Sequence, residues 1–147
     1  MWMVHNANHL RDSIDGLKVG GHQASSASIT TIMTALYFNV LRIEDRVAVK
    51  PHASPVFHAI QYMLGRQTED KLKAFRSLGG TQSYPPRTKD TDGVDFSTGS
   101  VGLGVAMTLF ASMVQDYTRL NEVIDKQPTK VNEPGRMIAV MGDAELD

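Results

Sequence analysis

The residues with the most specific chemistry follow an apolar run near the end of the chain, where the segment 137–141 is succeeded at once by Gly142 and Asp143. A continuous apolar run of this kind is typical of a parallel strand covered on both faces, and ligands of open α/β sheets bind beyond the carboxyl ends of strands. Gly142 would permit a tight turn with close backbone approach, and the Asp143 carboxylate is an oxygen ligand suited to Mg²⁺. A solvated aspartate in a strand-end turn explains the same pattern, so the spacing alone leaves both interpretations open.

A second candidate is the glycine-rich stretch from Thr98 to Gly104, which leads into an apolar segment. Glycines there would let backbone N–H groups and a helix N-terminus approach an anion or a ring. Their G-x-x-G-x-G spacing differs from the G-x-G-x-x-G fingerprint of dinucleotide-binding domains, which counts against the alternative of a nucleotide-binding oxidoreductase. Close packing of a helix explains the same glycines equally well.

Two histidines stand in segments that we expect to be loops. His22 lies in a turn before a predicted helix, and His52 follows a predicted strand and precedes another helix. An imidazole in such a place can bind a phosphate or move a proton. Because a lone loop histidine more often makes structural hydrogen bonds, the pattern by itself does not make either one catalytic.

The elements that must position these candidates alternate between helix-like and strand-like patterns. Apolar residues at helical spacing predict a helix over 25–41 with a serine as its N-cap, and 46–50 is typical of a short strand that Pro51 ends. The segment 102–114 is apolar or small on every side, which predicts a helix buried all round. The alternation indicates an α/β fold with a parallel sheet flanked by helices. The other predicted elements are helices over 54–65 and 68–78, an ordered loop over 81–95, a surface connection over 121–135 and a strand over 137–141.

Composition excludes several classes of function. The 147 residues suit one domain, and 15 Lys and Arg against 16 Asp and Glu give a net charge of -1, which argues against a nucleic-acid partner or a polybasic membrane surface. No apolar run approaches the roughly 18 residues that a membrane helix needs. The absence of cysteine rules out disulfides, thiolate zinc sites and cysteine nucleophiles. We therefore expect a cytoplasmic protein with neither a nucleic-acid nor a membrane partner.

Four of these features occur in an order that resembles one known family. Gly21-His22, Pro51-His52, the loop 99–104 and Gly142-Asp143 follow one another as in the thiamine-diphosphate enzymes of the transketolase superfamily. The amino-acid sequence over 20–26, 95–99 and 142–147 is most similar to that of the homodimeric pyruvate dehydrogenases, the decarboxylating components of their complex, and of transketolase-like relatives. The resemblance spans nearly the whole chain and implies the thiamine-diphosphate-binding fold, in incomplete form.

The resemblance implies a role for each matching residue. Asp143 resembles the first Mg²⁺ ligand of the family's Gly-Asp-Gly diphosphate motif, in which Ala144 stands where the second glycine is usual. His52 resembles a histidine near the diphosphate and the reacting carbon, and His22 resembles a substrate-side histidine, so these two are the implied catalytic residues. Backbone groups of the loop 99–102 are implied to hold the aminopyrimidine ring. The residues implied to contact thiamine diphosphate are Ser25, His52, Gly99, Ser100, Val101, Gly102, Gly142, Asp143, Ala144 and Glu145.

For function, the resemblance implies chemistry that depends on thiamine diphosphate and Mg²⁺. In a pyruvate dehydrogenase this is the oxidative decarboxylation of pyruvate or a related 2-oxo acid. In a transketolase, the alternative, it is the transfer of a two-carbon unit between sugar phosphates. The full-length enzyme is expected to be a homodimer and part of a multienzyme complex.

The family's remaining metal ligands and the glutamate that activates the aminopyrimidine lie downstream of its Gly-Asp motif, and its active sites lie between subunits. We therefore expect residues 1–147 to be a partial diphosphate-binding domain without a second domain. By itself the chain is expected to be catalytically inactive and to bind the cofactor weakly or not at all. A further alternative is a non-catalytic, truncated module that pairs with a full-length partner.

Overall fold

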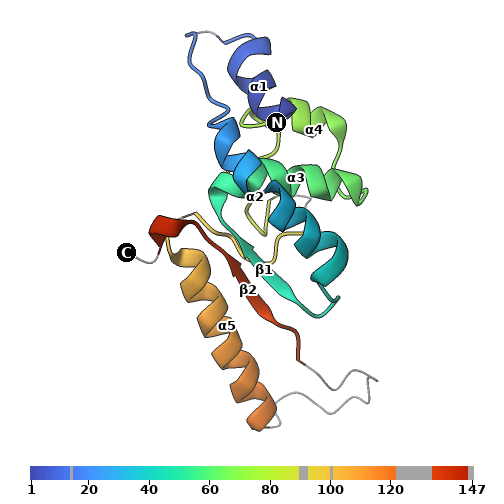
Figure 1. Ribbon diagram of the computed structural model, residues 1–147, viewed down its shortest axis with the longest axis vertical. Helices are drawn as coiled ribbons and strands as arrows, with labels where there is room; N and C mark the ends of the chain where they lie inside the picture. Colours follow the sequence, from blue (N-terminus) through green and yellow to red (C-terminus); the bar gives the residue numbers. More distant parts are fainter. Residues whose placement is uncertain (14, 90–92, 100, 122–133, 146–147) are drawn as a thin grey trace.

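Two parallel strands form the centre of the computed structural model, which describes residues 1–13, 15–89, 93–99, 101–121 and 134–145. Strand β1 (Arg46–Val49) pairs with β2 (Met137–Val140) in a register that joins Arg46 to Met137 and Val49 to Val140. Figure 1 shows the two strands side by side, with helices on both sides of them. The predicted α/β fold with a parallel sheet is confirmed.

The alternation of side chains along β1 explains why helices cover both faces. Val47 and Val49 point to the face that packs against α2 (Gln23–Ala35) and α3 (Ser54–Met63). Ala48 points to the other face, where a Cβ placed on Gly104 of α5 (Leu103–Leu120) would lie 3.4 Å from the Ala48 Cβ. Successive strand residues face opposite sides of a sheet, so the chain forms three layers with the strands between α2 and α3 on one side and α5 on the other.

The main hydrophobic core lies between the sheet and the first of these helical layers. Its helical members recur at i and i+4 along α2 and α3, which is the spacing that places apolar side chains on one face of a helix. This core consists of Ile29, Met33, Val47, Val49, Ala53, Val56, Phe57 and Ile60.

Several helices depart from their predicted bounds. Helix α2 begins at Gln23 with His22 as its N-cap residue, not with one of the serines, and it continues into a π-helical turn, Leu36–Val40. Helix α4 (Glu69–Lys73) begins after its N-cap residue Thr68, whose hydroxyl accepts a hydrogen bond from the Lys71 N–H at 3.4 Å. It ends five residues before the predicted bound because the chain turns there, and Arg76 adopts the left-handed φ of 59°.

The N-terminal segment forms a helical unit that the sequence patterns did not reveal. Helix α1 (Trp2–His5) runs directly into a π-helical segment, Asn6–Leu10. Met3 and Ala7 of this unit pack against the fully buried Phe75 in a second, smaller core. The unit thereby fastens the start of the chain to the segment that follows α4.

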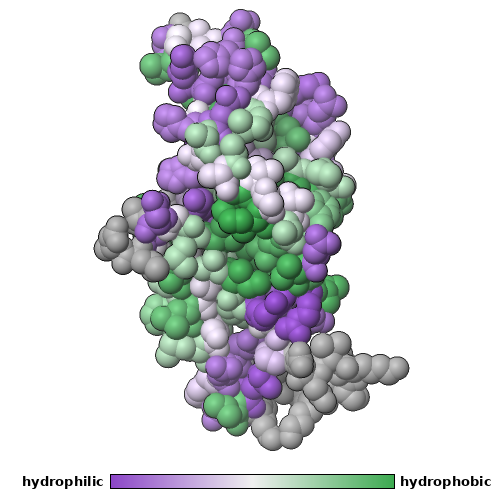
Figure 2. Space-filling model, in the orientation of Figure 1, coloured by the Kyte–Doolittle hydropathy of each residue, from purple (hydrophilic) through white to green (hydrophobic). Residues whose placement is uncertain are grey.

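Helix α5 corrects the prediction of a helix buried on every side. It is longer than predicted, and Thr108 is its only buried residue in the described part of the chain. Most of its apolar side chains face outward, and Figure 2 shows hydrophobic residues reaching the surface where α5 runs. The large apolar side chains of α5 that are exposed are Leu103, Leu109, Phe110, Met113, Val114, Tyr117 and Leu120.

Two further expectations are answered in part. Strand β2 lies where it was predicted, but its residues are half-buried rather than covered on both faces. The predicted connection over 121–135 falls almost entirely outside the described residues. Among the helices that the structure describes, none is long and apolar enough to cross a membrane.

A buried carboxylate joins the starts of the two strands. Asp45, whose side chain is fully buried, accepts hydrogen bonds from the Arg136 N–H at 2.7 Å and from the Arg42 N–H at 2.9 Å. The Arg136 guanidinium, which is half-exposed, also pairs with the same carboxylate. These contacts fix the residue before β1 against the residue before β2 and so set the strand register.

Replacing Asp45 by alanine should lower the free energy of unfolding by about 1–3 kcal/mol, because N–H groups of Arg42 and Arg136 would lose their acceptor. Urea unfolding followed by circular dichroism measures the change. Asp116→Asn, on the exposed side of α5, is the matched control and should leave the midpoint unchanged. An equal midpoint for Asp45→Ala and the native chain would contradict the role given to Asp45.

The same site should make stability depend on pH. The hydrogen bonds from Arg136, acting against the cost of burial, hold the pKa of the Asp45 carboxyl well below its usual range. Because an unfolded aspartate has a pKa of about 3.9, this contribution is complete above that pH and is lost as the pH falls toward the folded pKa. Below about pH 4 the free energy of unfolding of the native chain should therefore fall more steeply with pH than that of the Asp45→Asn variant. The midpoints of urea unfolding, measured at a series of pH values, test this.

Candidate functional site

An open cleft of about 360 Å³ lies at the carboxyl ends of the two strands. Parallel pairing places these ends together, and each is followed by a short 3-10 turn: Pro51–Ala53 after β1 and Asp143–Glu145 after β2. A larger hollow of about 490 Å³ beside Gly79 and Gly80 contains none of the predicted site residues. The cleft at the strand ends is lined by Ser25, Ser28, Lys50, His52, Val101, Gly142, Asp143 and Glu145.

Six of the predicted site residues meet in this cleft, although they come from four distant segments of the sequence. Ser25 lies in the first turns of α2, His52 in the turn after β1, Val101 before α5, and the other three after β2. Ala144 belongs to the same turn as Asp143 through its backbone. The six that line the cleft are Ser25, His52, Val101, Gly142, Asp143 and Glu145.

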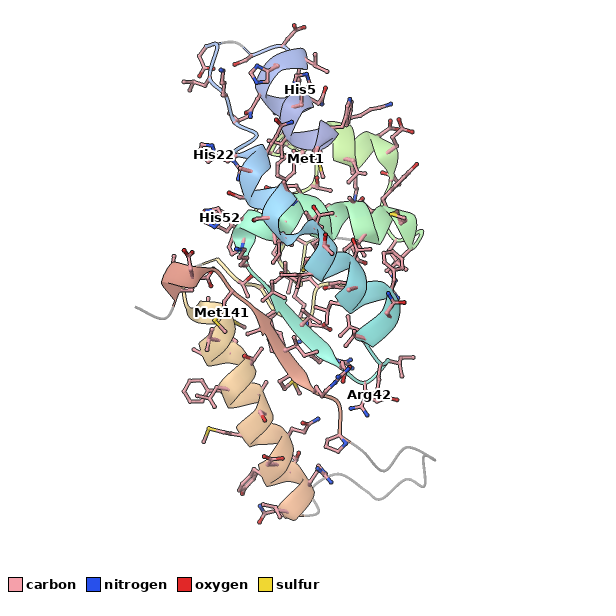
Figure 3. The ribbon with its side chains drawn as sticks, in the orientation of Figure 1. Met1, His5, His22, Arg42, His52 and Met141 are labelled. Carbon is pink, nitrogen blue, oxygen red and sulfur yellow. The ribbon has the colours of Figure 1, made fainter. Side chains whose placement is uncertain are left out.

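Three other predicted residues stand differently. His22 is exposed at the N-terminus of α2 and does not line the cleft, but Figure 3 shows its ring on the same side of the molecule as His52. Gly99 is exposed, with no atom closer than 4.0 Å to a Cβ placed on it. Ser100 lies outside the described residues.

Gly102 connects the glycine-rich loop to the turn after β2. Its φ of 75° belongs to the left-handed region, where side chains are disfavoured. A Cβ on Gly102 would also lie 3.1 Å from the Glu145 carbonyl oxygen. A glycine at this position therefore lets the start of α5 sit directly against the turn that carries Asp143.

The segment before the glycine-rich loop is attached along the free edge of β1. A carboxylate oxygen of Asp95 accepts a hydrogen bond from the Val47 N–H at 2.9 Å, and the buried Thr98 hydroxyl donates one to the Val49 carbonyl. These side chains satisfy backbone groups that a neighbouring strand would otherwise pair. As a result the loop that begins at Gly99 starts beside the carboxyl end of β1.

The turn that carries His22 is held by two residues from elsewhere in the chain. The Asn8 amide accepts a hydrogen bond from the Gly20 N–H at 2.6 Å and donates one to the Gly21 carbonyl at 2.9 Å. The Arg76 guanidinium donates to the Val19 carbonyl at 2.6 Å. A side chain at Gly20 would strike the Val4 carbonyl, since its Cβ would lie 2.5 Å from that oxygen. The backbone before His22 is therefore closely fixed.

The charges of the cleft are two carboxylates, from Asp143 and Glu145, and one ammonium, from Lys50, beside the His52 imidazole. Within the described ranges, no group of three or more histidine, aspartate or glutamate side chains is placed to hold a metal ion. Asp143, which is exposed, is the candidate oxygen ligand for a cation, with the Glu145 carboxylate beside it, and the same cleft contains cationic and hydroxyl groups suited to an anion.

Sequence reasoning missed several residues that take part in this arrangement. Lys50 directly follows β1, so the argument from strand ends that singled out Asp143 would have found it. Ser28 lies one helical turn beyond Ser25 and shares its face of α2. Asn8 and Arg76 are 12 and 55 residues from Gly20 and Gly21, and no local pattern announces such contacts.

The chain matches, over residues 11–147, the family described as the transketolase thiamine diphosphate binding domain. Its relatives include pyruvate dehydrogenase E1 components from Mycolicibacterium smegmatis, 31% identical over 99% of this chain, and from Cupriavidus necator, 30% identical over 88%. The corresponding protein of Escherichia coli K12 is 29% identical over 94% of this chain. The chain spans 15–16% of the length of these curated relatives.

The family match covers residues 11–147 and so includes every residue that lines the strand-end cleft. The chain therefore belongs to the family of transketolase-type thiamine-diphosphate-binding domains.

Proposed function

We propose that this chain forms the diphosphate-binding part of a thiamine-diphosphate enzyme that acts on pyruvate or a related 2-oxo acid. The observation that carries the proposal is the meeting of six residues from four segments in one cleft at the carboxyl ends of β1 and β2. The relatives described above are named pyruvate dehydrogenase E1 components, which favours a 2-oxo acid over the sugar phosphates of a transketolase.

The residues of the cleft fit a diphosphate with its metal ion. Gly142 lines the cleft without a side chain of its own, and the Asp143 carboxylate is available as an oxygen ligand. Mg²⁺ is commonly bound by one or two carboxylates together with phosphate oxygens of the ligand. We propose that Asp143 is the protein's first such ligand and that the Ser25 hydroxyl and the backbone of the turn 143–145 contact the diphosphate.

The two histidines are assigned proton and charge roles on the substrate side of the cofactor. When bound, thiamine diphosphate supplies the carbanion that attacks the keto carbon of the substrate. His52, which lines the cleft, is placed to donate a hydrogen bond to oxygen atoms on which negative charge develops. His22, held by the fixed turn before α2, is the candidate for moving a proton at the outer side of the site.

The first test of this proposal is cofactor binding by the chain alone, followed by the shifts of backbone amide signals in NMR spectra. Thiamine diphosphate with Mg²⁺ should shift the signals of residues around the cleft, with a dissociation constant in the millimolar range or weaker, because one carboxylate is a poor magnesium site. Asp143→Asn should abolish the part of the affinity that Mg²⁺ adds.

Asp116→Asn serves as the matched control and should bind as the native chain does. Signals that shift only at sites remote from the cleft would contradict the proposed site. Micromolar binding would contradict the expectation that the chain alone is an incomplete cofactor site.

We further propose that the exposed apolar face of α5 packs against a second copy of the chain. The face begins beside the cleft, since α5 starts at the residue after Gly102, and a net charge of -1 offers little repulsion between copies. An exposed apolar patch of this extent is typical of protein interfaces. A partner on α5 would thereby complete a site that lies between subunits.

Sedimentation equilibrium tests this contact. The native chain should form dimers as its concentration rises, and Phe110→Glu should weaken the dimer by about tenfold or more, because burying a charge in an apolar contact is costly. Leu78→Glu, at a fully exposed position outside α5, is the control and should dimerise as the native chain does. A native chain that stays monomeric at all concentrations, or dimers indifferent to Phe110→Glu, would contradict the proposal.

A further inference from the structure

Lys50 places an ammonium group in the cleft, and no role has yet been given to it. Its backbone N–H donates to the Val140 carbonyl at 3.1 Å, and its own carbonyl accepts from the Ala53 N–H at 2.9 Å. The residue is thus tied to both strands and to the turn that carries His52. This fixed backbone directs a half-buried side chain into the cleft beside Gly142, Asp143 and Glu145.

The ammonium lies over Gly142. A Cβ placed on Gly142 would be 3.5 Å from the Lys50 Nζ and 3.5 Å from a carboxylate oxygen of Glu145. The two charged groups therefore flank the glycine, yet no ion pair or hydrogen bond of the Lys50 ammonium is found among the described residues. An ammonium that lines a cleft without such a partner can donate charge-assisted hydrogen bonds to a bound anion.

The formal charges of the groups that line the cleft indicate what the lysine contributes. The carboxylates of Asp143 and Glu145 together cancel both charges of one Mg²⁺, so a metal-loaded cleft without the lysine would be formally neutral when His52 is uncharged. With Lys50 the metal-loaded cleft carries a formal charge of +1, and without metal the lysine reduces the formal charge of the cleft from -2 to -1 and supplies an ammonium that can contact the anion directly. The Ser25 hydroxyl, which also lines the cleft, provides a further donor, whereas the Ser28 hydroxyl donates to the Ser25 carbonyl at 3.1 Å.

We infer that Lys50 is a direct diphosphate-binding residue, whose ammonium contacts the diphosphate group and contributes to its binding whether or not Mg²⁺ is present. The inference rests on the proposed function for the identity of the ligand, since thiamine diphosphate brings the diphosphate. The anion-binding chemistry itself depends on the lysine and the cleft, so it can be tested apart from the metal and from the rest of the cofactor.

The test is a titration with inorganic pyrophosphate in the presence of a chelator, followed by NMR signals of residues around the cleft. The native chain should bind, and Lys50→Met, which keeps the length and the apolar stem of the side chain, should lose about tenfold in affinity, as expected for a charge-assisted hydrogen bond. Lys50→Arg should restore most of the binding. Lys18→Met, at an exposed position outside the cleft, is the matched control and should bind as the native chain does.

Circular dichroism and the unchanged NMR signals of α2 and α3 establish that each variant is folded. The inference is overturned if the folded Lys50→Met chain binds pyrophosphate as well as the native chain, or if the native chain does not bind it. Loss of binding in Lys50→Met supports the inference even if thiamine diphosphate with Mg²⁺ fails to bind and the proposed function fails. Conversely, metal-dependent cofactor binding that needs Asp143 but not Lys50 overturns this inference and leaves the proposed function intact.

Discussion

The parallel pairing of β1 with β2 decides where every chemically useful group of this chain lies. Asp45 ties the beginnings of the strands together through Arg136, and with that register fixed, the residues that follow the strands must emerge at the same end. Lys50 and His52 follow one strand, and Asp143 follows the other. The cleft is therefore a consequence of strand direction, since an antiparallel pair would send Lys50 and Asp143 to opposite ends.

The unpaired edge of β1 determines how the rest of the cleft is built. An open strand edge leaves backbone N–H and C=O groups without partners, and here the Asp95 and Thr98 side chains supply them. These two residues come just before the loop that begins at Gly99. The hydrogen bonds that pair the edge of β1 therefore also hold the start of this loop beside the strand. Gly102 then allows the chain to pass against the turn of Glu145 and enter α5.

Local patterns were sufficient to predict the core elements and the strand-end residues. The short strand predicted over 46–50 and the helical spacing of Ile29 and Met33 depend on short-range geometry, and both were confirmed. The apolar character of α5 was also visible, but a pattern of apolar residues does not say what covers them, and most of the large apolar side chains of α5 proved exposed. The contacts of Asn8 and Arg76 with the turn before His22 join residues far apart in sequence. Side-chain hydrogen bonds between such distant residues produce no periodic pattern in the amino-acid sequence.

The charge balance of the cleft explains why an incomplete metal site is compatible with anion binding. A single carboxylate attracts a divalent cation weakly, because Mg²⁺ keeps a nearly octahedral shell of oxygen ligands, and each carboxylate in the cleft also repels a diphosphate. A lysine adds positive charge that needs no coordination geometry, and Lys50 lines the same cleft as the two carboxylate-bearing residues and His52. Its ammonium reduces the repulsion in the absence of metal and adds to the attraction when metal is present. With metal the formal charge of the cleft changes from neutral to positive through this lysine, and without metal it changes from -2 to -1, so the same side chain favours an anion in both states relative to a cleft built from carboxylates alone.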